Sequence, residues 1–121
     1  MAEKYVSETN LKEFFNNIYA KVTPNIVDNT VTLLPNREYD CEGAVITKLN
    51  IEFGAAADNY SSEYIISITL GATPDITFPS NVIWAGGIVP DFTKMGGATC
   101  LLCFIPLGNY MLGTWVAIKE E

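Results

Sequence analysis

Two cysteines in the C-terminal third of the chain have the spacing of a redox motif: Cys100 and Cys103 are separated by two leucines. A working dithiol needs a thiolate, which a helix N-terminus or a nearby cation usually stabilises. This pair instead lies in an apolar, strand-like run, where residues three apart point to opposite faces, and its nearest cation in the sequence is Lys94. We therefore expect buried cysteines that act as small apolar side chains. Three cysteines, with Cys41 as the third, cannot all pair with one another, so the sequence implies no disulfide framework.

The sequence gives weak evidence for metal, phosphate or carboxylate chemistry. It has no His, which is the commonest zinc ligand and general base. Oxygens near Asp58 and Asp75 could bind calcium, but scattered loop Asp residues usually serve turns. The glycine pairs at 86–87 and 96–97 lack the Lys of a phosphate loop, and they indicate turns with positive φ or a close approach of two backbones. Any two of the 14 acids could form a catalytic pair, but no spacing singles one out. We expect no catalytic residue, no metal and no cofactor.

Aromatic side chains provide a better binding hypothesis. Flat Trp and Tyr rings can stack on sugar rings, and a largely uncharged surface would suit a neutral glycan. The alternative is that both Trp residues belong to the core, which is the commoner place for them in a domain of this size. The candidate platform residues are Trp84, Trp115, Tyr60 and Tyr110.

Length and charge narrow the class of protein. The chain has 121 residues, 49% of them hydrophobic, which fits one folded domain. It carries 14 acids against seven bases, a net charge of −7, so we do not expect a nucleic acid partner. No apolar run approaches the ~18 residues of a membrane helix, and the first residues do not resemble a secretory signal, so we expect no membrane insertion.

The N-terminal residues have the period of a helix. Their apolar positions recur three and four residues apart, which places them on one helical face. Ser7 is suited to the N-cap, and Pro24 would stop the helix, so we predict a helix over about residues 8–22 within an N-terminal unit at 1–24. The face could pack on the domain's own sheet, or it could form a seam between subunits. The residues of this predicted oligomerisation face are Leu11, Phe14, Phe15, Ile18, Tyr19 and Val22.

After Pro24 the period changes to two. Residues 44–53 alternate between apolar and polar side chains, which predicts a half-exposed antiparallel strand. Further strands are expected at 31–34, 64–70, 76–78 and 82–84, and a closing hairpin at 100–105 and 110–118. The predicted fold is mainly β: a β-sandwich or jelly-roll-like domain at residues 25–121, preceded by one N-terminal amphipathic helix.

One segment resembles a known class of proteins. Residues 76–90, ITFPSNVIWAGGIVP, resemble a pattern of small β domains in bacteriophage fibre proteins: a hydrophobic residue, Thr-Phe-Pro-Ser, then a hydrophobic residue, x-Trp-x-x-Gly-x-x-Pro. A turn at Lys94–Gly97 and an apolar strand at 100–105 follow, as in that pattern. In this pattern Phe78 would fill the core, and Trp84 would pack under the loop at 86–87.

The resemblance implies a non-enzymatic structural protein of the bacteriophage virion: a head fibre, a capsid decoration protein, or a tail or baseplate fibre component. Such proteins are commonly homotrimers displayed on the particle surface, so it also implies a homo-oligomer, contacts with other virion proteins, and host attachment with a surface glycan as a candidate partner. Two alternatives stay open. One is a monomeric carbohydrate-binding module, and the other is a small glycoside hydrolase that uses two carboxylates.

Overall fold

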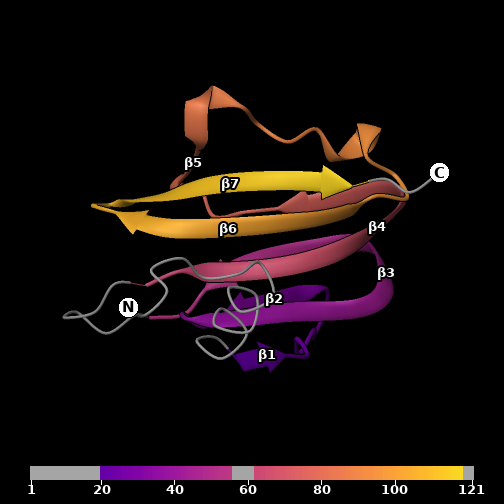
Figure 1. The fold of residues 1–121 in the computed structure, drawn as a ribbon, viewed down its shortest axis with the longest axis horizontal. Helices are drawn as coiled ribbons and strands as arrows, with labels where there is room; N and C mark the ends of the chain where they lie inside the picture. The colour runs from indigo at the N-terminus through magenta and orange to yellow at the C-terminus, as the bar shows by residue number, and fades with distance from the viewer. Residues whose placement is uncertain (1–19, 56–61, 119–121) are drawn as a thin grey trace, which may run out of the picture.

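The computed structural model describes residues 20–55 and 62–118 of the chain, and in this part the fold is mainly β, as predicted (Figure 1). Two single-turn 3₁₀ helices, η1 (Ala85–Gly87) and η2 (Phe92–Lys94), lie between the fifth and sixth strands. The strands of the described part are β1 (Ala20–Val22), β2 (Thr30–Leu33), β3 (Arg37–Phe53), β4 (Tyr64–Thr77), β5 (Val82–Trp84), β6 (Thr99–Leu107) and β7 (Tyr110–Ile118).

All seven strands belong to one hydrogen-bonded sheet. The order is β1-β3-β4-β6-β7-β5, and β2 also pairs with β3. The pairs β1–β3, β2–β3, β3–β4 and β5–β7 are parallel, whereas β4–β6 and β6–β7 are antiparallel. The sheet is therefore parallel at both ends and antiparallel in the middle.

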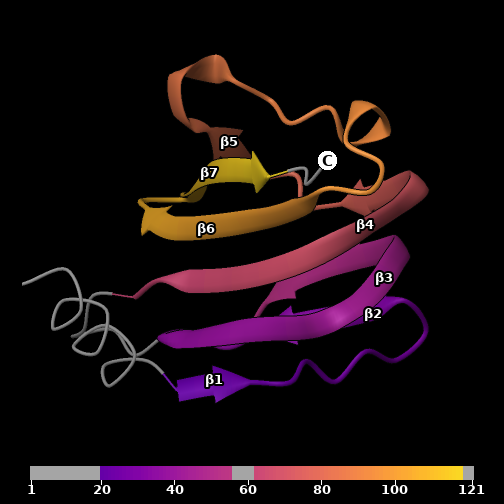
Figure 2. The same cartoon turned by 45° about the vertical axis from the view of Figure 1, so that its right-hand side comes forward.

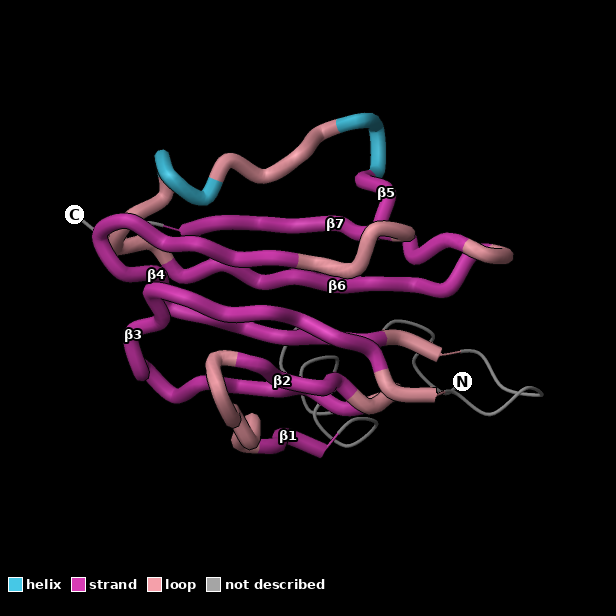
Figure 3. Tube along the Cα trace, turned by 180° about the vertical axis from the view of Figure 1, so that it is seen from behind, coloured by secondary structure: helices cyan, strands magenta, loops and turns pink. Residues whose placement is uncertain are grey.

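The sheet folds over on itself because its two longest strands bend. Figures 1 and 2 show β3 and β4 turning back at the same end of the molecule. The register between them shifts at two places, between Asp40 and Val45 and between Ile46 and Lys48 on β3. Gly71 of β4 permits the close approach at this bend, since a Cβ there would lie 2.5 Å from Cγ2 of Thr47. As a result β2, the second half of β3 and the end of β4 form a second layer, seen from behind in Figure 3.

The core lies between the two arms of the folded sheet. Alternate residues of β4 are buried, among them Ile66 and Ile68, and so are Leu102 and Phe104 of β6. Phe53, at the end of β3, has its ring centroid 4.9 Å from that of Phe104. These two residues lie on strands that are not neighbours in the sheet, so their contact joins the two layers.

The predicted N-terminal helix is wrong at its C-terminal end. Residues 8–19 lie outside the described residues, but Ala20–Val22 form strand β1, which pairs in parallel with Arg37–Tyr39 of β3. The residue before a proline is pushed away from helical angles, and here that residue is the β-branched Thr23, preceded by Val22. An extended chain at this point gains backbone hydrogen bonds from β3 that a last helical turn cannot offer.

The strand predicted at 44–53 is present, but its pairing was predicted wrongly. It is the second half of β3 and runs parallel to both β2 and β4. The predicted alternation holds at Leu49 and Ile51, which are buried, and fails at Val45, which is 63% exposed where the strand bends. Alternation reports which face a side chain occupies, and it carries no information about strand direction.

The other strand predictions agree more closely with the structure. The β6–β7 hairpin is confirmed, with Leu107 opposite Tyr110 across the turn. The separate strand expected at 76–78 is instead the last part of β4, because the stretch Gly71–Pro74 bends that strand without ending it.

Candidate functional site

Both faces of the β6–β7 hairpin are apolar, although only one of them faces the core. On β6, Cys100, Leu102 and Phe104 point inward and are fully buried. The residues between them point outward and lie opposite outward residues of β7: Leu101 pairs with Val116, and Ile105 pairs with Leu112. On the other side of β7, Leu112 pairs with Ile83 of β5. We call this outward side of β5, β6 and β7 the outer face.

The outer face exposes large apolar side chains in an unbroken group. Their exposed fractions range from 39% at Ile83 to 64% at Ile118, and Tyr110 at the hairpin end is 55% exposed. Monomeric proteins rarely expose contiguous apolar patches beyond a few hundred Å², and larger ones usually mark interaction sites. The exposed aliphatic members are Ile83, Leu101, Ile105, Leu107, Val116 and Ile118.

The outer face also carries no charged side chain. The sequence has no Asp, Glu, Lys or Arg at 82–90 or at 98–118. In the part of β4 that pairs with β6, residues 64–69, the outward residues are also uncharged, as at Ser67, which pairs with Leu101. Acids stand at the border of this face: Glu63 just before β4, and Glu38 and Asp40 on β3, opposite Ile65 and Ser67. An acidic chain thus presents a neutral apolar surface bordered by carboxylates.

Cys103 sits in the middle of the outer face. It pairs with Ile65 of β4 and Thr114 of β7, and it is partly exposed. Burial raises the pKa of the Cys103 thiol, and the nearby charge of Glu63 raises it further. The two other cysteines, Cys41 and Cys100, are buried, and all three are free. Cys100 and Cys103 point to opposite faces of β6, as predicted, but only Cys100 is buried, so the expectation of two buried cysteines is wrong at Cys103.

Trp84 lies in an aromatic cluster with Phe78 and Phe104. Its ring centroid is 5.1 Å from that of Phe78 and 5.8 Å from that of Phe104, in edge-to-face contacts. The ring lies directly on Gly113 of β7, where a Cβ would be 2.8 Å from two of its atoms. The expectation that the loop at 86–87 admits this ring is wrong: no atom of Trp84 lies within 4 Å of a Cβ built on either glycine of that loop. The glycine that makes room for Trp84 is Gly113.

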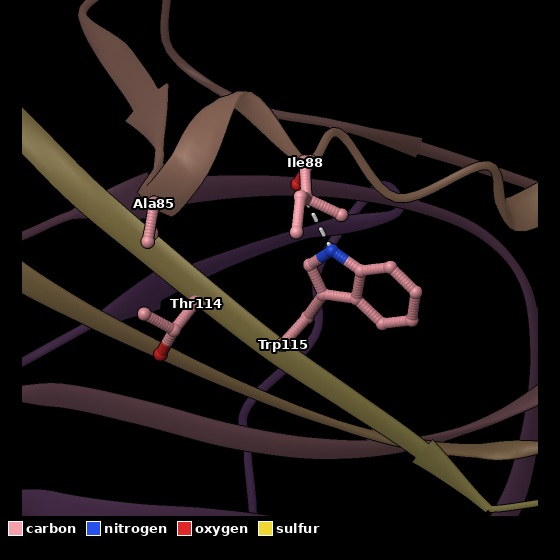
Figure 4. Close-up of a pocket in the computed structure, with 5 residues that line it drawn as sticks. Ala85, Ile88, Thr114 and Trp115 are labelled. Carbon is pink, nitrogen blue, oxygen red and sulfur yellow. Dashed lines mark hydrogen bonds between the residues drawn. The ribbon is translucent and has the colours of Figure 1, made fainter.

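Trp115 lines a shallow pocket beside β7 (Figure 4). The pocket has a volume of about 370 Å³, and Ala85, Ile88, Gly113 and Thr114 complete its lining. The indole Nε1 of Trp115 donates a hydrogen bond to the carbonyl oxygen of Ile88 at 3.1 Å. This bond fixes the ring against the segment after η1, so its polar edge is already in use. The structure thereby places Trp115 beside a pocket and Trp84 against the core.

The remaining predicted site residues are not brought together. Five of the six residues of the predicted oligomerisation face, from Leu11 to Tyr19, lie outside the described residues, as does Tyr60. The sixth, Val22, is half-buried in β1 and packs against the core. Tyr110 is exposed at the end of the hairpin, away from the residues that line the Trp115 pocket.

The described acids and cysteines form no group of three or more that could hold a metal ion. Asp58 lies outside the described residues, so the calcium alternative is tested only at Asp75. Asp91 serves a turn: its carboxylate accepts hydrogen bonds from the backbone N–H of Thr93 at 3.2 Å and from the hydroxyl of the same residue.

No helix within the described residues is long and apolar enough to cross a membrane.

Sequence reasoning missed the outer face. The signal was present, because the run from Leu101 to Ile105 is apolar at every position and therefore cannot bury all its side chains on one side of a sheet. The absence of charge over residues 98–118 indicated the same surface.

Comparisons with known proteins give no match: no family model, curated protein or solved structure is similar to this chain at a significant level.

Proposed function

We propose that this chain is a non-enzymatic structural protein of a bacteriophage particle, displayed on the particle surface and assembled as a homo-oligomer. The observation that carries the assembly role is the outer face. A neutral apolar surface on a chain of net charge −7 is suited to a lasting contact with another subunit. On this proposal the chain acts as a head fibre, a capsid decoration protein, or a tail or baseplate fibre component.

The packing of the resembling segment supports the phage assignment. Phe78 and Trp84, the two aromatic residues of the pattern, contact one another and Phe104 of the apolar strand that follows. The turn at Met95–Ala98 is hydrogen-bonded to β4, since the N–H of Gly97 donates to the carbonyl oxygen of Leu70 at 2.9 Å. The pattern thus describes one packed unit within a mainly β fold, which is the kind of small β domain that the resemblance implies.

The choice of a trimer over other homo-oligomers remains part of the proposal. It rests on the resemblance alone, and of the helical face predicted to form the seam, Val22 belongs to β1. The outer face is the assembly surface that the described residues support, whatever the number of subunits.

The particle itself provides the test of this function. An antibody raised against the purified chain should label the surface of intact particles of the phage or prophage that encodes it, in negative-stain electron microscopy. Particles that stay unlabelled, while the protein is abundant in the lysate of infected cells, would contradict the proposal. As a control, an antibody against a known surface protein is tested on particles with and without that protein. Labelling only of the particles that carry it shows that surface epitopes are accessible and that the labelling is specific.

A second candidate function is glycan binding at the Trp115 pocket. The specific observation is an apolar pocket with a fixed indole ring at its wall, which suits the flat face of a neutral sugar. Titration with neutral oligosaccharides should then shift the tryptophan fluorescence, and Trp115→Phe should abolish the shift. Unchanged fluorescence across a panel of such sugars would contradict glycan binding at this pocket.

A further inference from the structure

We propose that a second copy of this chain covers the outer face of β5, β6 and β7. This inference rests on the proposed function and deepens it, because it names both the surface and the partner of the assembly contact.

Charge favours a second copy as the occupant. Two copies of a chain with net charge −7 repel each other wherever their carboxylates meet. The strands β5, β6 and β7 carry no charged side chain, and the acids nearest to the outer face stand at its border: Glu63 just before β4, and Glu38 and Asp40 on β3. Two copies that meet there keep their carboxylates at the border, where water screens them. A basic partner would instead be drawn to the acidic parts of the surface.

The outer face has the composition of the centre of a subunit contact. β6 and β7 each have nine residues, so together with the adjoining β4 the face is about 30 Å long and about 15 Å wide, a flat area of about 450 Å². A standard interface buries roughly 800 Å² on each partner, and its centre is apolar with few charges, so the outer face would supply about half of such a contact. The exposed aliphatic side chains of the outer face, with Thr114 and Cys103 between them, match that composition.

Val116→Glu tests the inference with a closely matched control. Val116 is 60% exposed on the outer face, opposite Leu101, so a Glu there folds readily but places an unpaired carboxylate in the contact. Val89→Glu makes the same change at a valine that is 66% exposed. Val89 follows Ile88, whose carbonyl binds Trp115, and Trp115 points to the opposite side of β7 from Val116.

In sedimentation velocity we expect the wild-type chain and Val89→Glu to form the same oligomer. Val116→Glu should raise the dissociation constant by roughly tenfold or more. Thermal unfolding of each variant checks that it is folded. An oligomer equally stable in Val116→Glu and in Val89→Glu overturns the inference.

Cys103 gives a second test, in which the wild-type chain itself reports whether the outer face is covered. Because Cys41 and Cys100 are buried, a maleimide reagent should react mainly with Cys103, and Cys103→Ser should confirm this assignment. Labelling of the wild-type chain should be on the order of tenfold slower at concentrations far above the dissociation constant than after dilution below it. A labelling rate independent of concentration overturns the inference, since a cover supplied by the same chain would protect Cys103 equally at every dilution.

These results separate the inference from the proposed function. If antibody labels the particle surface while Val116→Glu leaves the oligomer intact, the chain is a particle protein that assembles through another surface. If particles stay unlabelled while Val116→Glu dissociates the oligomer, the self-association is real and the phage role is wrong.

Discussion

Gly113 determines how the aromatic part of the core is packed. The Trp84 ring lies on it, and Phe104 stands close by, with one ring atom 3.2 Å from where a Cβ would be. Phe104 in turn contacts Phe53, Phe78 and Trp84, so it links the end of β3 to the segment around β5. A glycine inside a strand usually weakens it, and here the close approach of an indole ring explains its presence.

We predict that Gly113→Ala destabilises the fold by about 1–3 kcal/mol, because the new methyl group would displace the Trp84 ring from a packed core. Urea unfolding followed by tryptophan fluorescence measures the loss. Thr114→Ala, at the exposed neighbouring position, should change the free energy of unfolding by less than about 0.5 kcal/mol. Equal effects of the two substitutions would contradict the packing described for Trp84.

The thiol of Cys100 makes stability depend on pH in the alkaline range. Burial raises the pKa of this thiol from 9.0 to about 11. As pH rises from 9 to 11, the unfolded chain loses a proton that the folded chain still holds, so the free energy of unfolding falls. We predict a loss of roughly 2 kcal/mol from this group over that range.

Urea unfolding at pH 8 and at pH 10.5 should show this loss in the wild-type chain, and a smaller one in Cys100→Ala. Burial also raises the pKa of Tyr64, but that group is common to both proteins and cancels in the comparison. Identical pH dependence in the two proteins would contradict the burial of Cys100.

At the scale of elements, the turn at Met95–Ala98 holds the segment after η2 against the bend of β4. A Cβ on Gly96 would lie 2.7 Å from the carbonyl oxygen of Ala72, which is backbone and cannot rotate away. The next residue, Gly97, has a φ of +84°. The sequence predicted a positive φ or a close approach of two backbones at the glycine pair 96–97. Gly97 has the positive φ, and Gly96 has the close approach.

We predict that Gly96→Ala costs about 2–3 kcal/mol, since either β4 or the turn must move. Gly87→Ala should cost only about 1 kcal/mol: its φ is +71°, but a Cβ there meets nothing within 4 Å. Thermal unfolding of the two variants compares these costs directly. A larger loss in Gly87→Ala would mean that the turn does not pack on β4.

Local patterns predicted the strands well and their arrangement poorly. The hairpin at 100–105 and 110–118 was readable because two apolar runs flank Gly108, whose φ of +62° suits the turn. The bends of β3 and β4 were not readable, since Gly71 and Pro74 look like the end of a strand when seen in sequence alone. The parallel pairing of β3 depends on contacts between distant segments, which no local period encodes.

The candidate site was predictable only in part. The period-two alternation of a strand predicted that Cys100 and Leu101 point to opposite faces, and Cys100 is the buried one. Of the two alternatives for Trp84, a sugar platform or a core residue, the structure agrees with the core residue. The outer face depends on the order of β5, β7 and β6, so it emerges only once these strands are placed side by side.

At the scale of the whole molecule, charge is distributed unevenly. The strands β5, β6 and β7 carry no charged side chain, whereas the chain as a whole has a net charge of −7 and an isoelectric point near 4.4. Acidic surfaces keep such a chain soluble and limit its contacts with other acidic molecules. The neutral face is left as the surface through which copies can associate.

Raising the salt concentration should therefore strengthen self-association or leave it unchanged, because salt screens the repulsion between two negative copies and does not weaken an apolar contact. Sedimentation velocity of the wild-type chain at about 50 mM and about 500 mM NaCl measures this, across the range where the Debye length shrinks several-fold. Dissociation at high salt would indicate a contact based on ion pairs and would contradict an uncharged interface.

The most direct test of the assembly role is the native mass of the purified full-length chain, measured by light scattering after size exclusion over a wide range of concentration. The account predicts a mass that is a multiple of the 13.3 kDa chain at high concentration, about 40 kDa for the trimer that the resemblance favours. A mass of 13.3 kDa at every concentration would contradict it, because the outer face would then stand uncovered on a monomer.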